Sequence, residues 1–117
     1  MHEVTSHKVN GLNEAITVNA IDIPGDGNAN HEYRMASENF CYELKFQKGP
    51  IGDAGPNGLS NEVLLAIVED RLIGFQAGKF ACRENAVALT KLQEALMWLH
   101  KRTRDRVARG VEGKSQL

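Results

Sequence analysis

The fold is decided by the stretch ACRENAVALTKLQEALMWLHKRTRDRVARG, residues 81–110. Leucines recur in it at alternating steps of three and four residues, which places them on one face of an α-helix. This spacing predicts a helix from about Ala81 to Ala108 that packs against a neighbouring helix, and Gly110 is expected to end it. The predicted seam consists of Leu89, Leu92, Leu96, Leu99 and Thr103.

The neighbouring helix is predicted just upstream, so that residues 59–109 form an antiparallel helical hairpin. Ser60 is a suitable N-cap, because its hydroxyl can accept a hydrogen bond from a free N–H of the first turn. Residues 63–68 are apolar almost all round, and one partner helix cannot cover them, so we infer a subunit interface there. The stripe expected to face the core is Leu65, Val68, Leu72 and Phe75.

Residues 14–47 predict a small antiparallel β part. The stretches 15–21, 31–35 and 40–46 are rich in β-branched or alternating apolar residues, as half-buried strands are. Residues 1–13 are polar, and we expect them to be loosely ordered. Residues 48–58 are so rich in glycine and proline that we expect a hinge without any regular element.

Together these features predict a single α+β domain over residues 1–117. A small N-terminal antiparallel β-sheet is followed by a long antiparallel two-helix hairpin, and the protein is oligomeric. A chain of 117 residues buries only a modest core, so association of copies would add stability.

Composition excludes several classes of function. The net charge is −1, there is no apolar leader, and no apolar run is long enough to span a bilayer. Two cysteines without metal-ligand spacing are expected to be packing residues in a reducing cytoplasm, and Met97 and Trp98 to pack in the core or at an interface. The chain has no phosphate-loop, dinucleotide, metalloprotease or serine-hydrolase motif. We therefore expect no catalytic residue, metal or cofactor.

The basic end of the second helix is the strongest candidate for binding. Arg102, Arg106 and Arg109 are spaced at i, i+4 and i+7, so they share one helical face. Guanidinium groups make bidentate contacts with phosphate, which suits a pyrophosphate or phosphodiester ligand. The alternative is a solvated helix end, where basic residues are stabilised by the helix dipole.

Four other residues allow both a binding and a structural interpretation. Phe75 could stack on a base or simply close the core stripe. Asn85 could contact a base edge or ribose, or hydrogen-bond locally. Arg71 could bind a ligand or pair with an acidic neighbour, while Asn57 precedes a helix N-terminus that can receive an anion.

Several stretches resemble the first-described Thoeris anti-defence protein family over roughly residues 14–113. The helical hairpin is also distantly similar to phage anti-CBASS sponges that hold cyclic dinucleotides. The order and spacing of the stretches are specific to the family. They are IDIPGDG (21–27), FQKGPI (46–51), NGLSNE (57–62), FACRENA (80–86), KLQEALMWL (91–99) and RGVEG (109–113).

The resemblance implies a phage protein that acts as a sponge in the cytoplasm of a bacterial host. Family members sequester, without cleavage, the glycocyclic ADP-ribose isomer made by TIR-domain proteins of Thoeris immunity. Some members also hold CBASS cyclic di- or trinucleotides in separate pockets and form homohexamers built from dimers. The implied partners are therefore small nucleotide signals and further copies of the chain, with no membrane and no nucleic-acid polymer.

The resemblance also assigns residues. In the family the ADP-ribose pocket lies between paired subunits, and its residues map by motif onto Phe75, Asn85, Arg102 and Arg109. The second, cyclic-oligonucleotide pocket maps onto Asn57, Arg71 and Arg106. The chain reads Gly113-Lys114-Ser115 where the family leads us to expect Gly-Thr-His.

Two alternatives stay open beside the sponge. The first is a hydrolase of the same signals, which would release cleaved nucleotide. The second is a small nucleic-acid-binding regulator that uses the basic C-terminal helix, whose affinity would fall steeply with salt. The near-neutral net charge and the interruptions at Asp105 and Glu112 disfavour the regulator.

Overall fold

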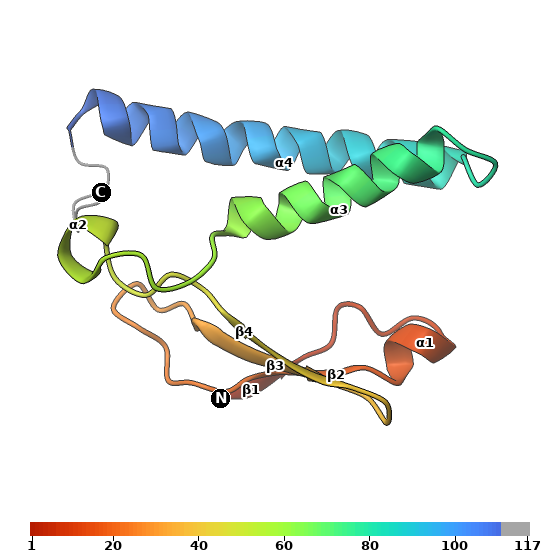
Figure 1. The fold of residues 1–117 in the computed structure, drawn as a ribbon, viewed down its shortest axis with the longest axis horizontal. Coiled ribbons are helices and arrows are strands. Elements are labelled where there is room, and N and C mark those ends of the chain that lie inside the picture. The colour runs from red at the N-terminus through yellow and green to blue at the C-terminus, as the bar shows by residue number, and fades with distance from the viewer. Residues whose placement is uncertain (111–117) are drawn as a thin grey trace. The chain divides into compact units, whose positions relative to one another are not determined.

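The computed structural model describes residues 1–110, so Glu112 and the Gly113–Ser115 departure lie outside the described residues. An antiparallel sheet precedes two long helices, which confirms the expected α+β class (Figure 1). The described chain divides into two compact units. Unit 1 contains residues 1–49 and 54–58, and unit 2 contains residues 50–53 and those from 59 onward.

Unit 1 is built on a four-stranded antiparallel sheet with the strand order β1-β2-β3-β4. The expectation of loosely ordered residues 1–13 is wrong, because this segment supplies β1 and most of a short helix, α1. Asn10 caps α1 by accepting a hydrogen bond from the Asn13 N–H (3.0 Å). The elements are β1 (His2–Val4), α1 (Gly11–Glu14), β2 (Thr17–Ala20), β3 (Glu32–Ala36) and β4 (Cys41–Lys45).

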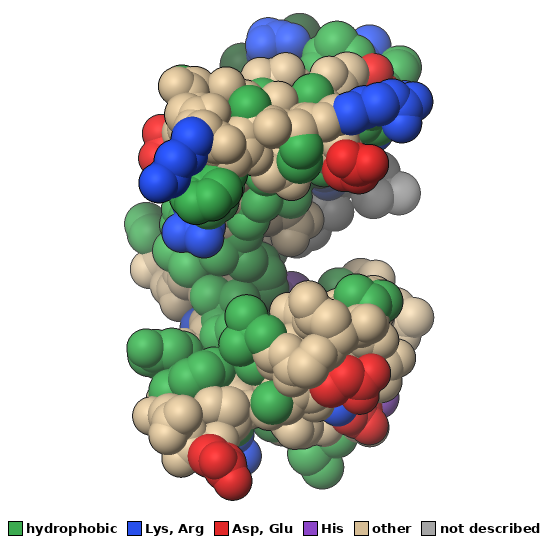
Figure 2. All heavy atoms as spheres, turned by 90° about the vertical axis from the view of Figure 1, so that its right-hand side faces the viewer, with side chains coloured by type: hydrophobic (Ala, Val, Ile, Leu, Met, Phe, Trp, Pro, Cys, Tyr) green, Lys and Arg blue, Asp and Glu red, His purple; other side chains and the backbone are tan. Residues whose placement is uncertain are grey.

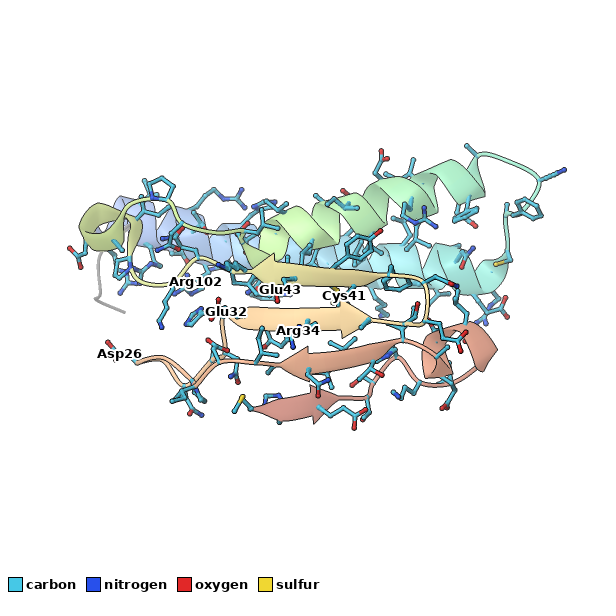
Figure 3. All side chains as sticks on the ribbon, turned by 60° about the horizontal axis from the view of Figure 1, so that its bottom comes forward. Asp26, Glu32, Arg34, Cys41, Glu43 and Arg102 are labelled. Carbon is cyan, nitrogen blue, oxygen red and sulfur yellow. The ribbon has the colours of Figure 1, made fainter. Side chains whose placement is uncertain are left out.

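The strand register separates the sheet into a polar and an apolar face. On the polar face Arg34 lies opposite Glu43 and forms an ion pair of 2.9 Å with it (Figure 3). The hydrogen bond from Arg34 to Glu43 raises the pKa of the Arg34 guanidinium above its usual value. On the other face, Tyr33 packs edge-on against Phe46 with ring centroids 5.7 Å apart, so β3 and β4 are joined on both sides.

The connection between β2 and β3 is organised around Asp22. Asn30 Nδ2 donates to Asp22 Oδ1 (3.0 Å), and the His31 N–H donates to Asp22 Oδ2 (3.0 Å). Burial by itself raises the pKa of Asp22, but the hydrogen bonds outweigh it and lower the pKa to about 2. Asp22 is therefore ionised at neutral pH, and its hydrogen bonds join the two ends of the loop.

The glycine- and proline-rich linker is more ordered than its composition indicates. It contains a one-turn helix, α2 (Ile51–Ala54), where we expected no regular element. In unit 1, Asn57 Oδ1 accepts from the Lys48 N–H (2.8 Å) and its Nδ2 donates to the Lys48 carbonyl (2.7 Å). A Cβ at Gly58 would collide with the Phe46 carbonyl, so only glycine fits at this crossing.

Unit 2 is a hairpin of two antiparallel helices, α3 (Asn61–Gln76) and α4 (Arg83–Ala108), which lie side by side in Figure 1. The prediction for Ser60 is confirmed, since its hydroxyl accepts from the Val63 N–H at 3.2 Å. Gly110 has a φ of +74° just beyond the end of α4, as a C-terminal glycine should. Cys82 caps α4 through a contact of its Sγ with the Asn85 N–H (3.4 Å).

The seam predicted for α4 is confirmed, but the stripe predicted for α3 is wrong at two positions. Every predicted α4 seam residue is half-buried or buried, and Leu96 is only 8% exposed. On α3, Leu65 and Leu72 are half-buried, whereas Val68 (45%) and Phe75 (38%) are exposed. Besides its leucines, the half-buried residues of α3 are Glu62, Glu69 and Gln76.

The described chain has a very small core of its own. Within residues 1–110, Ala20 and Leu96 are the buried apolar side chains. Both cysteines are exposed, so the expectation that they pack inside the chain is wrong. None of the described helices has the length and apolar character needed to cross a bilayer. The exposed large apolar residues of α3, α4 and the turn between them are Val63, Ile67, Val68, Ile73, Phe75, Phe80, Val87, Met97, Trp98 and Val107.

Candidate nucleotide-binding site

A hollow of about 740 Å³ lies at the C-terminal end of α4. Its volume is within the range of small-molecule sites, roughly 300–1,000 Å³. Side chains one and two turns apart on α4 converge on it, because residues spaced by three and four share a helical face. The described residues that line it are Trp98, Lys101, Arg102, Asp105, Arg106, Ala108 and Arg109.

The hollow brings together the three arginines that the sequence places on one face. Arg102, which is labelled on α4 in Figure 3, and Arg109 are exposed, whereas Arg106 is only 6% exposed. A guanidinium stays charged at any physiological pH, so the hollow is a strongly basic site. Such a site can hold the oxygens of a phosphate or pyrophosphate.

Asp105 is the single acidic group among the described residues that line the hollow. Lys101 Nζ donates to Asp105 Oδ2 at 2.6 Å. This hydrogen bond, together with the charges of Lys101, Arg109 and Arg104, lowers the pKa of Asp105 below its usual value. Asp105 therefore stays negative at neutral pH and opposes the binding of an anion.

Asp105→Asn is expected to tighten the binding of an anionic nucleotide severalfold at low salt, because it removes this repulsion. Isothermal titration at two salt concentrations measures the effect, and the gain should shrink as salt rises. Asp70→Asn, which makes the same change at an exposed position of α3, serves as the control. Weaker binding in Asp105→Asn would mean that the carboxylate instead accepts a hydrogen bond from the ligand.

The turn end of the hairpin carries a second cluster, made of rings and cations. Arg71 lies over the Phe75 ring, 5.6 Å from its centroid, and Phe75 meets Phe80 edge-on at 6.4 Å. Lys79 lies 5.4 Å from the centroid of Phe80. Figure 2 looks onto this end and shows Lys and Arg side chains beside hydrophobic ones. Phe75 and Arg71, which the family resemblance assigns to two different pockets, are thus neighbours.

Asn85 lies close to this end, in the first turn of α4, and is half-buried. The turn that precedes it is fixed by a hydrogen bond from the Cys82 N–H to Gln76 Oε1 (3.0 Å). Asn85 also continues the α4 seam, since it lies four residues before Leu89. Its side-chain amide is therefore held at the turn end of the hairpin, together with Phe75.

The predicted ADP-ribose residues occupy opposite ends of the helical hairpin. Asn85 and Arg102 are separated by seventeen residues of continuous helix, which is about 25 Å at 1.5 Å per residue. A small cyclic nucleotide is too short to contact both residues of one chain. A pocket that contains both must therefore combine two chains.

Asn57 belongs to unit 1, whereas the other predicted site residues belong to unit 2. Both groups of its side-chain amide bind Lys48, and its backbone N–H donates to Gln47 Oε1 (2.8 Å). The observed role of Asn57 is thus to close the linker loop. Its assignment to a ligand pocket remains a prediction.

Sequence reasoning missed two exposed aromatic residues beside the site. Trp98 was expected to pack in the core or at an interface; in the single chain it is outside the core, 64% exposed, and lines the basic hollow. Phe80, at 65% exposed, was not assigned any role. The spacing of Trp98, four residues before Arg102, was the available signal that it lies on the arginine face.

The fold and the site define a small α+β protein with a helical hairpin, a basic helix end and an aromatic turn. Residues 42–104 match the family model described as "Acb2/Tad1, hairpin domain". A relative from Bacillus phage SBSphiJ7, named "Thoeris anti-defense 1", is 49% identical over 90 residues. The match covers 74% of this chain and 63% of the relative. The chain therefore belongs to this Thoeris anti-defence family and carries its hairpin domain.

Proposed function

We propose that this chain is a phage anti-defence sponge that acts in the cytoplasm of the bacterial host. It binds the glycocyclic ADP-ribose signal of Thoeris immunity and withholds it without cleaving it. The single observation that carries the proposal is the basic hollow of α4, where Trp98 and three arginines line one site. Family membership and the name of the phage relative point in the same direction.

The proposed pocket is shared between two copies of the chain. Phe75 and Asn85 of one copy contact the base and ribose, while Arg102 and Arg109 of the other hold the phosphates. The separation of about 25 Å between the two groups along α4 supports this division. An antiparallel two-fold pair would form two such pockets, because each chain contributes both halves.

Exposed apolar surface supports the association of copies that this pocket needs. Ile67 (54%), Ile73 (47%) and Val87 (43%) are among the residues that the single chain leaves uncovered. Burying such side chains between copies would stabilise an assembly. We propose a dimer-based homo-oligomer that reaches a hexamer, as the family resemblance implies.

We further propose a second pocket for CBASS cyclic di- or trinucleotides, with Asn57, Arg71 and Arg106 as its residues. In the single chain the guanidinium of Arg71 already lies over the Phe75 ring. A ligand phosphate would have to compete with the ring for this cation. Cyclic oligonucleotides therefore belong in any binding panel.

Recovery of the ligand tests the central proposal. The purified protein is incubated with glycocyclic ADP-ribose, separated from free ligand and heat-denatured, and the released nucleotide is analysed by mass spectrometry. A sponge releases the intact signal in proportion to the protein. A cleaved product would establish the hydrolase instead.

A melting panel distinguishes the remaining alternative. Cyclic ADP-ribose isomers and cyclic oligonucleotides are each added far above the expected Kd, where a bound ligand stabilises by about 3 kcal/mol. A shift with DNA alone, and an affinity that falls steeply with salt, would identify a nucleic-acid-binding regulator.

A further inference from the structure

Trp98 is an exposed indole on the arginine face of α4. It lies four residues before Arg102 and eleven before Arg109, and these spacings keep all three on one side of the helix. Its side chain is 64% exposed and lines the same hollow. A large aromatic surface in water is costly, so an exposed indole beside cations indicates a contact that the single chain lacks.

The face of the Trp98 ring is open, in contrast to the phenylalanines at the turn. Arg71 lies over Phe75 and Lys79 over Phe80, so each of these rings already carries a cation. Within residues 1–110, no cation or second ring is placed over Trp98 in this way. Among the described residues, Trp98 is therefore the hairpin ring that has no cation over it, whereas Phe75 and Phe80 each have a cation over one face of the ring.

We infer that Trp98 is the base-stacking platform of the basic hollow, and that the hollow takes a nucleotide. The base lies on the indole while its phosphates contact Arg102 and Arg109. Trp98 and Arg102 are about 6 Å apart along the helix axis, a separation that one ribose bridges between a base and its phosphate. Stacking on an aromatic ring is tolerant of base identity, whereas the arginines select for phosphate.

This inference rests on the proposed function and deepens it, since it adds a residue to the arginine half of the pocket. In the shared pocket, Trp98 of one copy and Phe75 of the other lie on the two faces of the same base. The competing explanation is that Trp98 only packs against another copy of the chain. The stacking and packing explanations differ in whether the indole is exposed to solvent in the ligand-free protein.

Intrinsic fluorescence reports on this residue directly, because Trp98 is the single tryptophan of the chain. Glycocyclic ADP-ribose is titrated into the full-length protein, with binding heat and tryptophan emission recorded on the same samples. We expect the emission of the free protein to be that of a water-exposed indole. Emission should then change in proportion to the fraction of ligand bound.

Variants separate stacking from packing. Trp98→Ala should weaken binding between about 5-fold and 150-fold, the range expected for one stacked base, while Trp98→Phe should retain most of the affinity. Met97→Ala is the matched control, since Met97 is 52% exposed and does not line the hollow. The oligomer mass of each variant should equal that of the wild type.

Two results would overturn the inference, and each is distinct from failure of the proposed function. Binding heat without a change in emission, and with equal affinity in Trp98→Ala, would exclude stacking while leaving the sponge intact. A loss of oligomer mass in Trp98→Ala, with blue-shifted emission in the free wild type, would show that the indole packs between subunits. An absence of binding heat in the wild type would exclude the proposed function itself, and the inference with it.

Discussion

Arg102→Ala is expected to abolish the stabilisation of the protein by glycocyclic ADP-ribose while leaving the melting point of the free protein nearly unchanged. Removing one partner of an enclosed charge pair costs about 2–5 kcal/mol, so the Kd should rise by roughly 30-fold or more. Arg102 is exposed and forms no ion pair with the described residues, so the fold does not depend on it. Thermal melting with and without ligand measures both effects.

Arg104→Ala is the matched control for this variant. Arg104 lies on the same turn of α4 and carries the same charge, but it does not line the hollow. The Arg104→Ala protein should bind the ligand nearly as well as the wild type does. A large fall in the melting point of free Arg102→Ala would identify Arg102 as a structural residue and contradict its assignment to the pocket.

Ile67→Glu is expected to break the assembly into smaller species and, because the pocket is shared, to weaken ligand binding as well. Ile67 is 54% exposed and lies outside the half-buried positions of α3. A carboxylate there harms the single chain little, but it would be buried without a partner at an interface. Light scattering after size-exclusion chromatography measures the mass of the assembly.

Ile23→Glu provides the comparison. Ile23 is 80% exposed in the loop before β3, so the same substitution there should not change the mass. An Ile67→Glu protein with wild-type mass and full binding would show that the outer face of α3 is not an interface between copies.

The buried face of α4 was predicted correctly because apolar residues in this helix are confined to few positions. Leu89, Leu96 and Leu99 alternate with polar residues, so one face stands out and the structure buries it. On α3 the pattern has little contrast, since apolar residues occur on every side. Sequence spacing therefore assigned Val68 and Phe75 to the buried face of α3. In the structure both are exposed, and Glu69 and Gln76 are half-buried beside the leucines.

Other differences come from interactions that a sequence window does not contain. β1 is a three-residue edge strand whose order comes from pairing with β2, fourteen to eighteen residues away. Cys82 caps α4 although cysteine is not among the favoured capping residues. Trp98 was expected to pack in the core or at an interface, and the structure instead shows it exposed in the single chain, where it lines the hollow with the arginines.

The candidate site was predictable in part. Spacing alone put Arg102, Arg106 and Arg109 on one face, and the structure confirms that they line one hollow. The pairing of Phe75 with Arg71 also follows from their spacing of four residues on α3, whereas the contact of Phe75 with Phe80 depends on how the turn after α3 folds. Contacts between chains lie beyond any single-chain pattern.

The most direct test of a pocket shared between two copies is complementation of two inactive variants. Phe75→Ala and Arg102→Ala chains are each expected to lose binding. When they are unfolded together in equal amounts and refolded, half of the pairs contain one chain of each kind. Each mixed pair has one pocket with both defects and one pocket with neither, so about a quarter of all pockets should bind.

Isothermal titration of the refolded mixture counts these pockets. The shared pocket predicts that sites of wild-type affinity return at about a quarter of the wild-type number. A mixture that binds no better than the separate variants would place Phe75 and Arg102 in different sites and contradict the shared pocket.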